Sequence, residues 1–262
     1  MNDTILPVFF FGHGSPLNAI EDNEFSRTWE RAADGLPRPR AILCISAHWL
    51  TKGSAVTAMD SPRTIHDFGG FPRELYGIRY PAPGSPAVAA EVAEALAPTE
   101  VSLDKEWGLD HGAWSVLRRV YPSADIPIIQ LGMDMGKPGT HHYGLGKRLR
   151  GLRSQGILIV GSGNIVHNLG MVAWDRMDRD DYAFDWARKI DGAFTELVAS
   201  GKDADLIAYE RLGRDALLAV PTPDHYYPLL YCLGARDPSE PVSVFNRKAV
   251  AGSLTMTSFR FG

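Results

Sequence analysis

The sequence predicts an α/β protein with one domain, in which a central, mostly parallel sheet is flanked by helices. Short, continuously apolar runs recur along the 262 residues, as in strands that helices cover on both faces. Segments with apolar residues at helical spacing lie between these runs. This alternation is typical of a parallel sheet with helical crossovers, and the length fits one large domain spanning residues 1–262.

The expected strands are short and rich in branched apolar residues or phenylalanine. The first apolar run follows a segment without basic residues and stops at Gly12. We therefore interpret it as a strand and not as a signal peptide. Strands are expected at residues 6–12, 41–47, 56–58, 126–131, 157–161, 242–245 and 254–261.

Helical patterns fill the intervals between these strands. Asn23 is a capping residue type before an amphipathic segment that carries Phe25 and Trp29. Pro86 suits the first turn of a second helix. Helices are expected at residues 23–33, 85–96, 113–120, 142–152 and 182–199.

Composition and charge argue against several classes of protein. A net charge of −4 disfavours nucleic acid as the main partner, because phosphate binding needs a cationic surface. The two cysteines, Cys44 and Cys232, lie in apolar surroundings and suit a reducing cytosol. No apolar stretch approaches the roughly 20 residues of a membrane span. We therefore expect a soluble, cytoplasmic protein without a membrane or nucleic-acid partner.

Residues 67–85 form the densest cluster of glycine, proline and aromatic residues. The segment is too irregular for a long helix or strand and too aromatic for a disordered linker. One interpretation is an ordered loop over a functional site. The other is a surface loop at a subunit contact, which would make the protein a homo-oligomer.

Four histidines follow strands or turns where an open α/β sheet would place a ligand. His13, His48 and His167 come after apolar runs, and His225 precedes an aromatic helix. Ligands of such sheets bind beyond the carboxyl ends of the strands. For His225, a helix cap provided by Asp224 is the structural alternative.

A single metal ion would explain these four histidines together. An imidazole buried without a partner costs on the order of 1–3 kcal/mol, and separate structural explanations would be needed for each ring. Imidazole is also the commonest side-chain ligand of transition metals. His111, next to Asp110, and His66 are further candidates for the same pocket.

Six segments, taken in order, resemble one enzyme family. They are GHGSP, SAHW, IHDFGGFP, GLDHGAW, GSGNIVHNL and DHYYPL. This series resembles the 4,5-DOPA extradiol dioxygenases, which belong to the class III extradiol superfamily that includes protocatechuate 4,5-dioxygenase. The resemblance implies a single catalytic domain with a non-haem Fe(II) site, in which Zn(II) is also a plausible bound metal.

The resemblance also implies roles for individual residues. It suggests His13, His48 and His225 as metal ligands, and His167 as an acid–base residue that is also counted as a ligand. His111 matches a pocket histidine that faces substrate or dioxygen. An all-histidine set departs from the usual facial triad of two histidines and one carboxylate.

The implied reaction is extradiol cleavage of a catechol such as L-DOPA by O2, giving a ring-opened semialdehyde. His66 and Tyr227 are our candidates for contacts with the substrate. Two alternatives remain open: a zinc-dependent hydrolase, in which metal-bound water is the nucleophile, and a non-catalytic metal-binding relative of the same fold.

Overall fold

The computed structural model describes residues 5–262; residues 1–4, which the predicted domain includes, lie outside this range. Within it, nine strands form one sheet in the order β5-β4-β6-β2-β7-β1-β11-β8, and β3 pairs with β6. A separate two-stranded sheet joins β10 to β9. The strands are β1 (Val8–Gly12), β2 (Ala41–Ser46), β3 (Leu50–Thr51), β4 (Ser54–Thr57), β5 (Val101–Asp104), β6 (Ile128–Asp134), β7 (Ile157–Gly163), β8 (Val242–Phe245), β9 (Ala249–Val250), β10 (Leu254–Thr255) and β11 (Ser258–Phe261).

The centre of the large sheet is parallel and its two sides are mixed. β7 pairs in parallel with both β1 and β2, and β2 pairs in parallel with β6. On either side, β4 runs antiparallel to β6, and β11 runs antiparallel to β1 and β8. The predicted fold class is therefore confirmed: an α/β fold with a mostly parallel central sheet.

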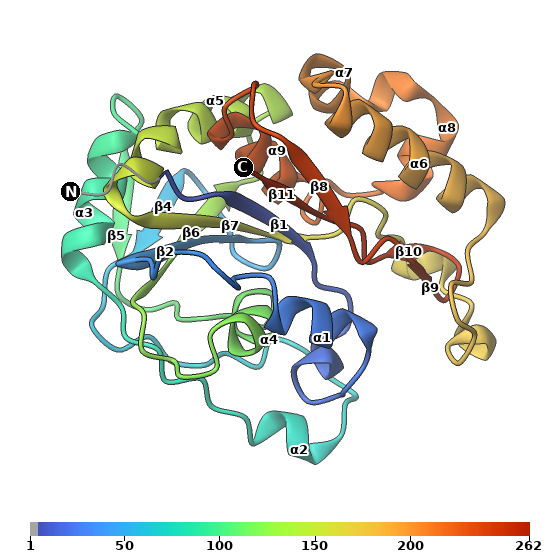
Figure 1. The fold of residues 1–262 in the computed structure, drawn as a ribbon, viewed down its shortest axis with the longest axis horizontal. Helices are drawn as coiled ribbons and strands as arrows, with labels where there is room; N and C mark the ends of the chain where they lie inside the picture. Colours follow the sequence, from blue (N-terminus) through green and yellow to red (C-terminus); the bar gives the residue numbers. More distant parts are fainter. Residues whose placement is uncertain (1–4) are drawn as a thin grey trace.

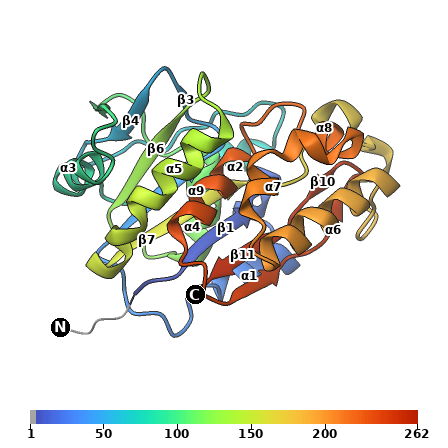
Figure 2. The same ribbon diagram turned by 90° about the horizontal axis from the view of Figure 1, so that it is seen from above.

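Helices cover both faces of this sheet. In Figure 1 the sheet separates α5, α6 and α9 from α1, α2 and α4, and Figure 2 shows α5 and α9 side by side. The helices are α1 (Glu24–Glu30), α2 (Arg73–Tyr76), α3 (Pro86–Ala95), α4 (His111–Val120), α5 (Gly139–Leu149), α6 (Asp185–Ala199), α7 (Asp203–Ile207), α8 (Arg214–Ala219) and α9 (Tyr227–Ala235).

The first strand shows why its sequence is apolar at every position. Phe10 belongs to the apolar cluster beneath α5, α6 and α9, whereas Phe9 and Phe11 belong to the cluster beneath α1 and α4. Successive side chains of a strand point to opposite faces of the sheet. Because both faces are covered, a continuous run of phenylalanines is buried on both sides.

Most predicted elements are present, with shifted ends. The predicted strand 254–261 is divided into β10 and β11, which belong to different sheets. The edge strand β5 escaped prediction because its side chains are half-buried or exposed and carry no apolar run. The segment 67–85 contains the short helix α2, and the predicted helix 142–152 begins earlier, at Gly139.

None of the described helices is a candidate membrane span. From residue 5 onward, each helix falls short of the length or the apolarity needed to cross a bilayer.

Truncating a phenylalanine of β1 should test the two-sided core. Phe10 is fully buried, and its ring centroid lies 6.1 Å from that of Phe259. We expect Phe10→Ala to lower the free energy of unfolding by about 3–5 kcal/mol. The matched control, Leu103→Ala on the exposed edge strand, should change it by less than about 0.5 kcal/mol. Urea denaturation of both variants measures the difference, and equal losses would contradict this account of the core.

Candidate metal centre

The carboxyl ends of three neighbouring parallel strands bring histidines to one edge of the sheet. His13 follows β1 directly, His48 comes just after β2, and His167 lies beyond β7. Hydrogen bonds extend the pairing past the strand ends: the His13 N–H donates to the Gly163 carbonyl at 3.0 Å, and the Ala47 N–H donates to the Ser162 carbonyl at 2.9 Å. The loops that carry His13 and His48 are therefore held by the end of β7.

His225 reaches the same edge from the connection between α8 and α9. Its carbonyl accepts a hydrogen bond from the Asn164 N–H at 2.9 Å. A Cβ atom on Gly163 would lie only 2.1 Å from that carbonyl oxygen. Glycine at this position therefore allows the His225 backbone to lie directly on the end of β7.

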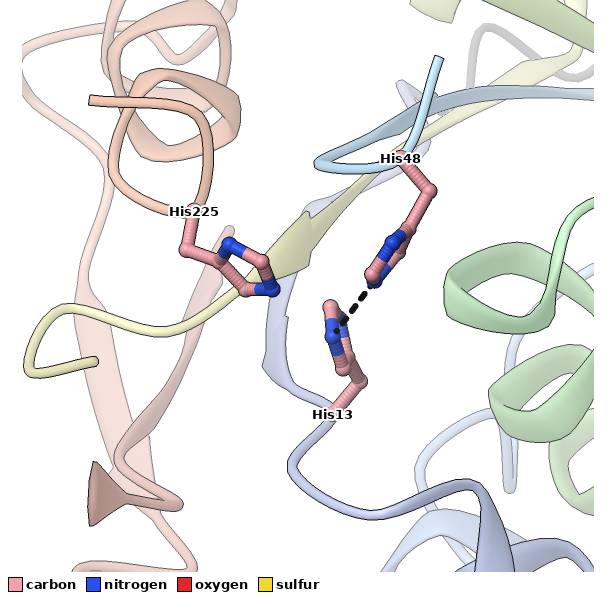
Figure 3. Close-up of side chains that lie close together, drawn as sticks. All are labelled: His13, His48 and His225. Atoms are coloured by element: carbon pink, nitrogen blue, oxygen red, sulfur yellow. Dashed lines mark hydrogen bonds between the residues drawn. The ribbon is translucent and has the colours of Figure 1, made fainter. Parts of the chain in front are cut away.

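The rings of His13, His48 and His225 converge, as Figure 3 shows. The Nε2 atoms of His13 and His48 are 3.2 Å apart, and the ring of His225 has its centroid 5.2 Å from that of His13 and 5.1 Å from that of His48. One ring nitrogen from each residue lies within 4.8 Å of the other two. Side chains far apart in the sequence thus meet at one point.

Neighbouring groups place a proton on the outer nitrogen of two of these rings. The Ser162 hydroxyl donates to the Gly112 carbonyl at 2.5 Å, so its oxygen accepts from His13 Nδ1, which is 3.0 Å away. His225 Nδ1 donates to the Asp224 carboxylate. An ionised carboxylate can accept hydrogen bonds but has no proton to donate. The Nε2 lone pairs of His13 and His225 are therefore left free. Ligating histidines in metal sites are oriented by such hydrogen bonds from the opposite ring nitrogen.

The donor set fits a divalent transition-metal ion. The Nε2 atoms of His13 and His48, 3.2 Å apart, can share one proton in a hydrogen bond or direct both lone pairs at one cation. Two nitrogens bound at about 2.0–2.1 Å to a tetrahedral ion would lie roughly 3.3 Å apart. Imidazole nitrogen suits zinc, iron, copper and nickel. The residues present therefore match a metal site by both spacing and chemistry.

Burial keeps these imidazoles in the neutral form that binds metals. Burial, followed by the proximity of the other histidines, lowers the pKa of His13 and of His225 well below the usual value. Burial also lowers the pKa of His48 to about 4, with His111 the next cause. Near neutral pH no proton has to be displaced from the three rings before an ion binds.

A second group joins His48 to His111 through Asp67. Asp67 Oδ2 lies 3.0 Å from His111 Nδ1 and 3.3 Å from His48 Nδ1, and neither contact is aligned as a hydrogen bond. Asp67 Oδ1 accepts the backbone N–H of His111 at 2.9 Å. Burial raises the pKa of Asp67, but the adjacent imidazoles of His111 and His48 and the backbone N–H of His111 outweigh this effect and lower the pKa to about 2. The ring centroids of His48 and His111 are 3.9 Å apart.

The position of His111 is determined by the start of α4. Asp110 caps this helix, and its buried carboxylate accepts from the Ser46 hydroxyl at 2.6 Å and from the Gln130 side-chain amide at 2.7 Å. A Cβ atom on Gly112 would lie 2.4 Å from Ser46 Oγ. The helix therefore begins directly against the end of β2, next to His48.

His167 lies beside the three converging histidines and not among them. Its ring is parallel to that of His225, with centroids 3.5 Å apart. The groups that could hold an ion within residues 5–262 do not include it, and its predicted role as a metal ligand stays a prediction. Burial lowers its pKa to about 4. His167 also lines the cavity described next, which suits a group that exchanges protons with a substrate.

A cavity of about 740 Å³ opens onto the histidines. Besides the rings, its walls are largely apolar and come from four segments: residues 14–25, the aromatic loop, the residues after His167, and residues 249–256. The apolar wall residues of the aromatic loop and of the segment after His167 are Phe68, Phe71, Leu169, Val172, Trp174 and Met177. The aromatic loop therefore lies over the candidate site, as one of its two interpretations predicted.

Two predicted substrate contacts are located elsewhere. His66 Nε2 is hydrogen-bonded to the Ile78 carbonyl at 3.1 Å, and Tyr227 packs on the buried ring of His142 with centroids 4.2 Å apart. Neither residue lines the cavity. Their contact with a substrate therefore stays a prediction that the lining of this cavity does not support.

Sequence reasoning missed the acceptors that orient the rings. Asp67 and Ser162 have no assigned role in the prediction, and Asp224 is considered only as a helix cap. The structure shows that Asp224 is bound to His225 and does not cap α9. The only available signal is adjacency: Asp224 precedes His225, and Asp67 follows His66 in the motif IHDFGG.

Comparison with known proteins agrees with this geometry. Residues 9–260 match the family described as the catalytic LigB subunit of aromatic ring-opening dioxygenase. The chain belongs to this LigB family. The predicted enzyme class, an aromatic ring-opening dioxygenase, is thereby confirmed, as is the resemblance drawn from the six motifs.

Relatives of this LigB-family chain match over nearly its full length. A 4,5-DOPA dioxygenase extradiol of Escherichia coli (strain K12) is 47% identical, covering 100% of this chain and 97% of the relative. A protein of the same name from Beta vulgaris is 36% identical, covering 99% and 97%. The crystal structure of the uncharacterized protein JW3007 from Escherichia coli K12 superposes with a TM-score of 0.82 at 43% identity, covering 98% of this chain and 100% of that one.

Enlarging Gly163 should separate His225 from the end of β7. We expect Gly163→Ala to lower the free energy of unfolding by about 1–3 kcal/mol, because the new methyl group would overlap the His225 carbonyl. Gly144→Ala is the control, since a Cβ there meets nothing within 4 Å. Urea denaturation of both variants measures the effect. Unchanged stability of Gly163→Ala would show that the close approach is not needed.

Proposed function

We propose that this protein cleaves the ring of a catechol such as L-DOPA at an extradiol bond, using O2 and giving a ring-opened semialdehyde, and that the chain forms one catalytic domain. The observation that carries the proposal is the convergence of three imidazoles at a cavity of about 740 Å³. Such a volume accommodates a small aromatic amino acid. The names of the relatives support L-DOPA as the first substrate to test.

His13, His48 and His225 would hold the metal ion, for which we propose Fe(II) in the active enzyme; Zn(II) would fit the same nitrogens. When bound, this ion supplies Lewis acidity and, as iron, a redox centre between the catechol and O2. Three protein ligands leave further coordination positions for the reactants. His13 and His225 require no deprotonation as donors, because their Nδ1 atoms carry the protons.

The cavity walls orient the substrate. Phe68 and Phe71 offer aromatic edges and faces to a catechol ring, and their own rings are 5.3 Å apart in an edge-to-face arrangement. Apolar walls also exclude water from the reacting atoms. Holding two reactants in a fixed relative orientation can supply several kcal/mol of the rate acceleration.

His167 and His111 are the groups available for proton transfer. Both line the cavity, on either side of the converging rings: His167 stacks on His225, and His111 packs against His48. We assign to His167 the removal of a catechol hydroxyl proton and its later return to an oxygen atom of the opened ring. His111 is assigned a hydrogen bond to the reacting oxygen atoms. Because the pKa of His167 is lowered to about 4, its ring is neutral near neutral pH and able to accept a proton, which the resulting imidazolium can return.

Removing a proposed ligand should remove both metal and activity. We expect His13→Ala and His48→Ala to lose most of the bound iron and their ring-cleavage activity, because two nitrogens cannot replace three in holding the ion. Metal content after anaerobic Fe(II) loading and oxygen uptake with L-DOPA measure the two effects. The control is His141→Ala, a ring outside the cavity lining. Wild-type metal content in both ligand variants would refute the assignment.

Replacing His167 should separate metal binding from catalysis. We expect His167→Ala to retain the metal and to lose about 10²–10⁴-fold in kcat, the usual contribution of a general acid–base group. Appearance of the coloured ring-opened product measures kcat, and metal analysis of the same sample provides the control. Loss of the metal together with activity would make His167 a ligand.

The same assays distinguish the alternative functions. A zinc-dependent hydrolase would consume no O2 and would work in the zinc form. A non-catalytic relative would bind the metal tightly without turning over any catechol. Comparing the iron-loaded and zinc-loaded proteins on a panel of catechols, with and without O2, tests all three functions.

A further inference from the structure

One carboxylate contacts two histidines to which the proposed function gives different roles. Asp67 Oδ2 faces Nδ1 of His48, a proposed metal ligand, and Nδ1 of His111, a proposed partner of the reacting oxygen atoms. Asp67 belongs to the aromatic loop, where the next residue, Phe68, lines the cavity. It is therefore the point at which the cavity wall meets the metal centre.

The other oxygen of Asp67 is held in place. Oδ1 accepts the backbone N–H of His111, and His111 is the first residue of α4, whose start is fixed by the buried carboxylate of Asp110. With Oδ1 tied to this helix, the carboxylate cannot rotate freely. Its Oδ2 atom is therefore directed at the two imidazoles.

An ionised carboxylate accepts hydrogen bonds and donates none. An imidazole nitrogen that faces Oδ2 is accordingly favoured in its protonated form, which leaves the lone pair on the opposite nitrogen. For His48 that opposite nitrogen is Nε2, which lies 3.2 Å from His13 Nε2. Ser162 and Asp224 accept hydrogen bonds from Nδ1 of His13 and of His225, and so leave the Nε2 lone pairs of those rings free.

We propose that Asp67 is a positioning residue that selects the metal-binding tautomer of His48 and, through His111, ties the aromatic loop to the metal centre. This inference rests on the proposed metal site. It assigns to Asp67 a role in metal affinity and not only in fold stability. Loss of an outer hydrogen-bonding partner of a metal ligand typically costs 10–100-fold in metal affinity.

Asparagine at position 67 should weaken metal binding more than alanine does. In Asp67→Asn, the amide oxygen can keep the bond to the His111 N–H, so the NH2 group replaces Oδ2 and donates to His48 Nδ1. That donor favours a proton on Nε2 and so blocks the metal-binding lone pair. Asp67→Ala removes the acceptor without adding a donor. A purely structural role predicts the opposite order, because asparagine preserves the shape of aspartate.

The test is the Zn(II) affinity of the full-length protein, measured by competition with a chelating dye. We expect Asp67→Asn to bind Zn(II) 10–100-fold more weakly than the wild type, and Asp67→Ala to lie between the two. Thermal unfolding without metal shows whether each variant is folded. Asp125→Asn is the matched control, since Asp125 forms an exposed ion pair with Arg38 away from the cavity.

Several results would overturn the inference. Wild-type Zn(II) affinity in Asp67→Asn would do so, and so would a greater loss of Zn(II) affinity in Asp67→Ala than in Asp67→Asn. If Asp67→Asn does not fold, wild-type Zn(II) affinity in Asp67→Ala would overturn the inference. Complete loss of Zn(II) from Asp67→Ala, with retention in His225→Ala, would instead make Asp67 a metal ligand together with His48 and His111. If the Zn(II) affinities of the wild type and the two variants follow the expected order but the iron-loaded wild type opens no catechol, the proposed reaction fails and the positioning role stands.

Discussion

The parallel pairing of β7 with both β1 and β2 is the constraint on which the site depends. It brings the ends of three strands to one edge of the sheet, and the last residues of β7 then hold the backbone of the neighbouring loops. Ser162 and Gly163 contribute in different ways: the hydroxyl orients His13, and the absent side chain admits His225. A shift of β7 by one residue would exchange these two contributions and disrupt both.

The site consists of an inner set of imidazoles and an outer set of acceptors. Each proposed ligand faces its own outer group: Ser162 for His13, Asp67 for His48 and Asp224 for His225. These groups come from different segments of the chain. The fold therefore specifies where the nitrogens meet and, for His13 and His225, which ring nitrogen carries the proton.

The sequence predicted the fold class and the convergence of histidines because both follow from local patterns. Buried strands appear as apolar runs, and a histidine after such a run must lie at the sheet edge. The sequence did not predict how side chains turn within loops. His66 and Tyr227 are adjacent in sequence to cavity or histidine-cluster residues, yet His66 bonds to the Ile78 carbonyl and Tyr227 packs on the His142 ring. The pairing of Asp67 with His48 depends on the path of a long loop, which carries no periodic signal.

The location of His225 has a consequence for how the protein matures. His13 and His48 are synthesised before His225 and before β11, the antiparallel neighbour of β1. Until the ribosome has made His225 and β11, β1 has an unpaired edge and only two of the three converging imidazoles exist. At the proposed site, an ion that needs all three imidazoles can be captured only after His225 has been synthesised, long after His13 and His48.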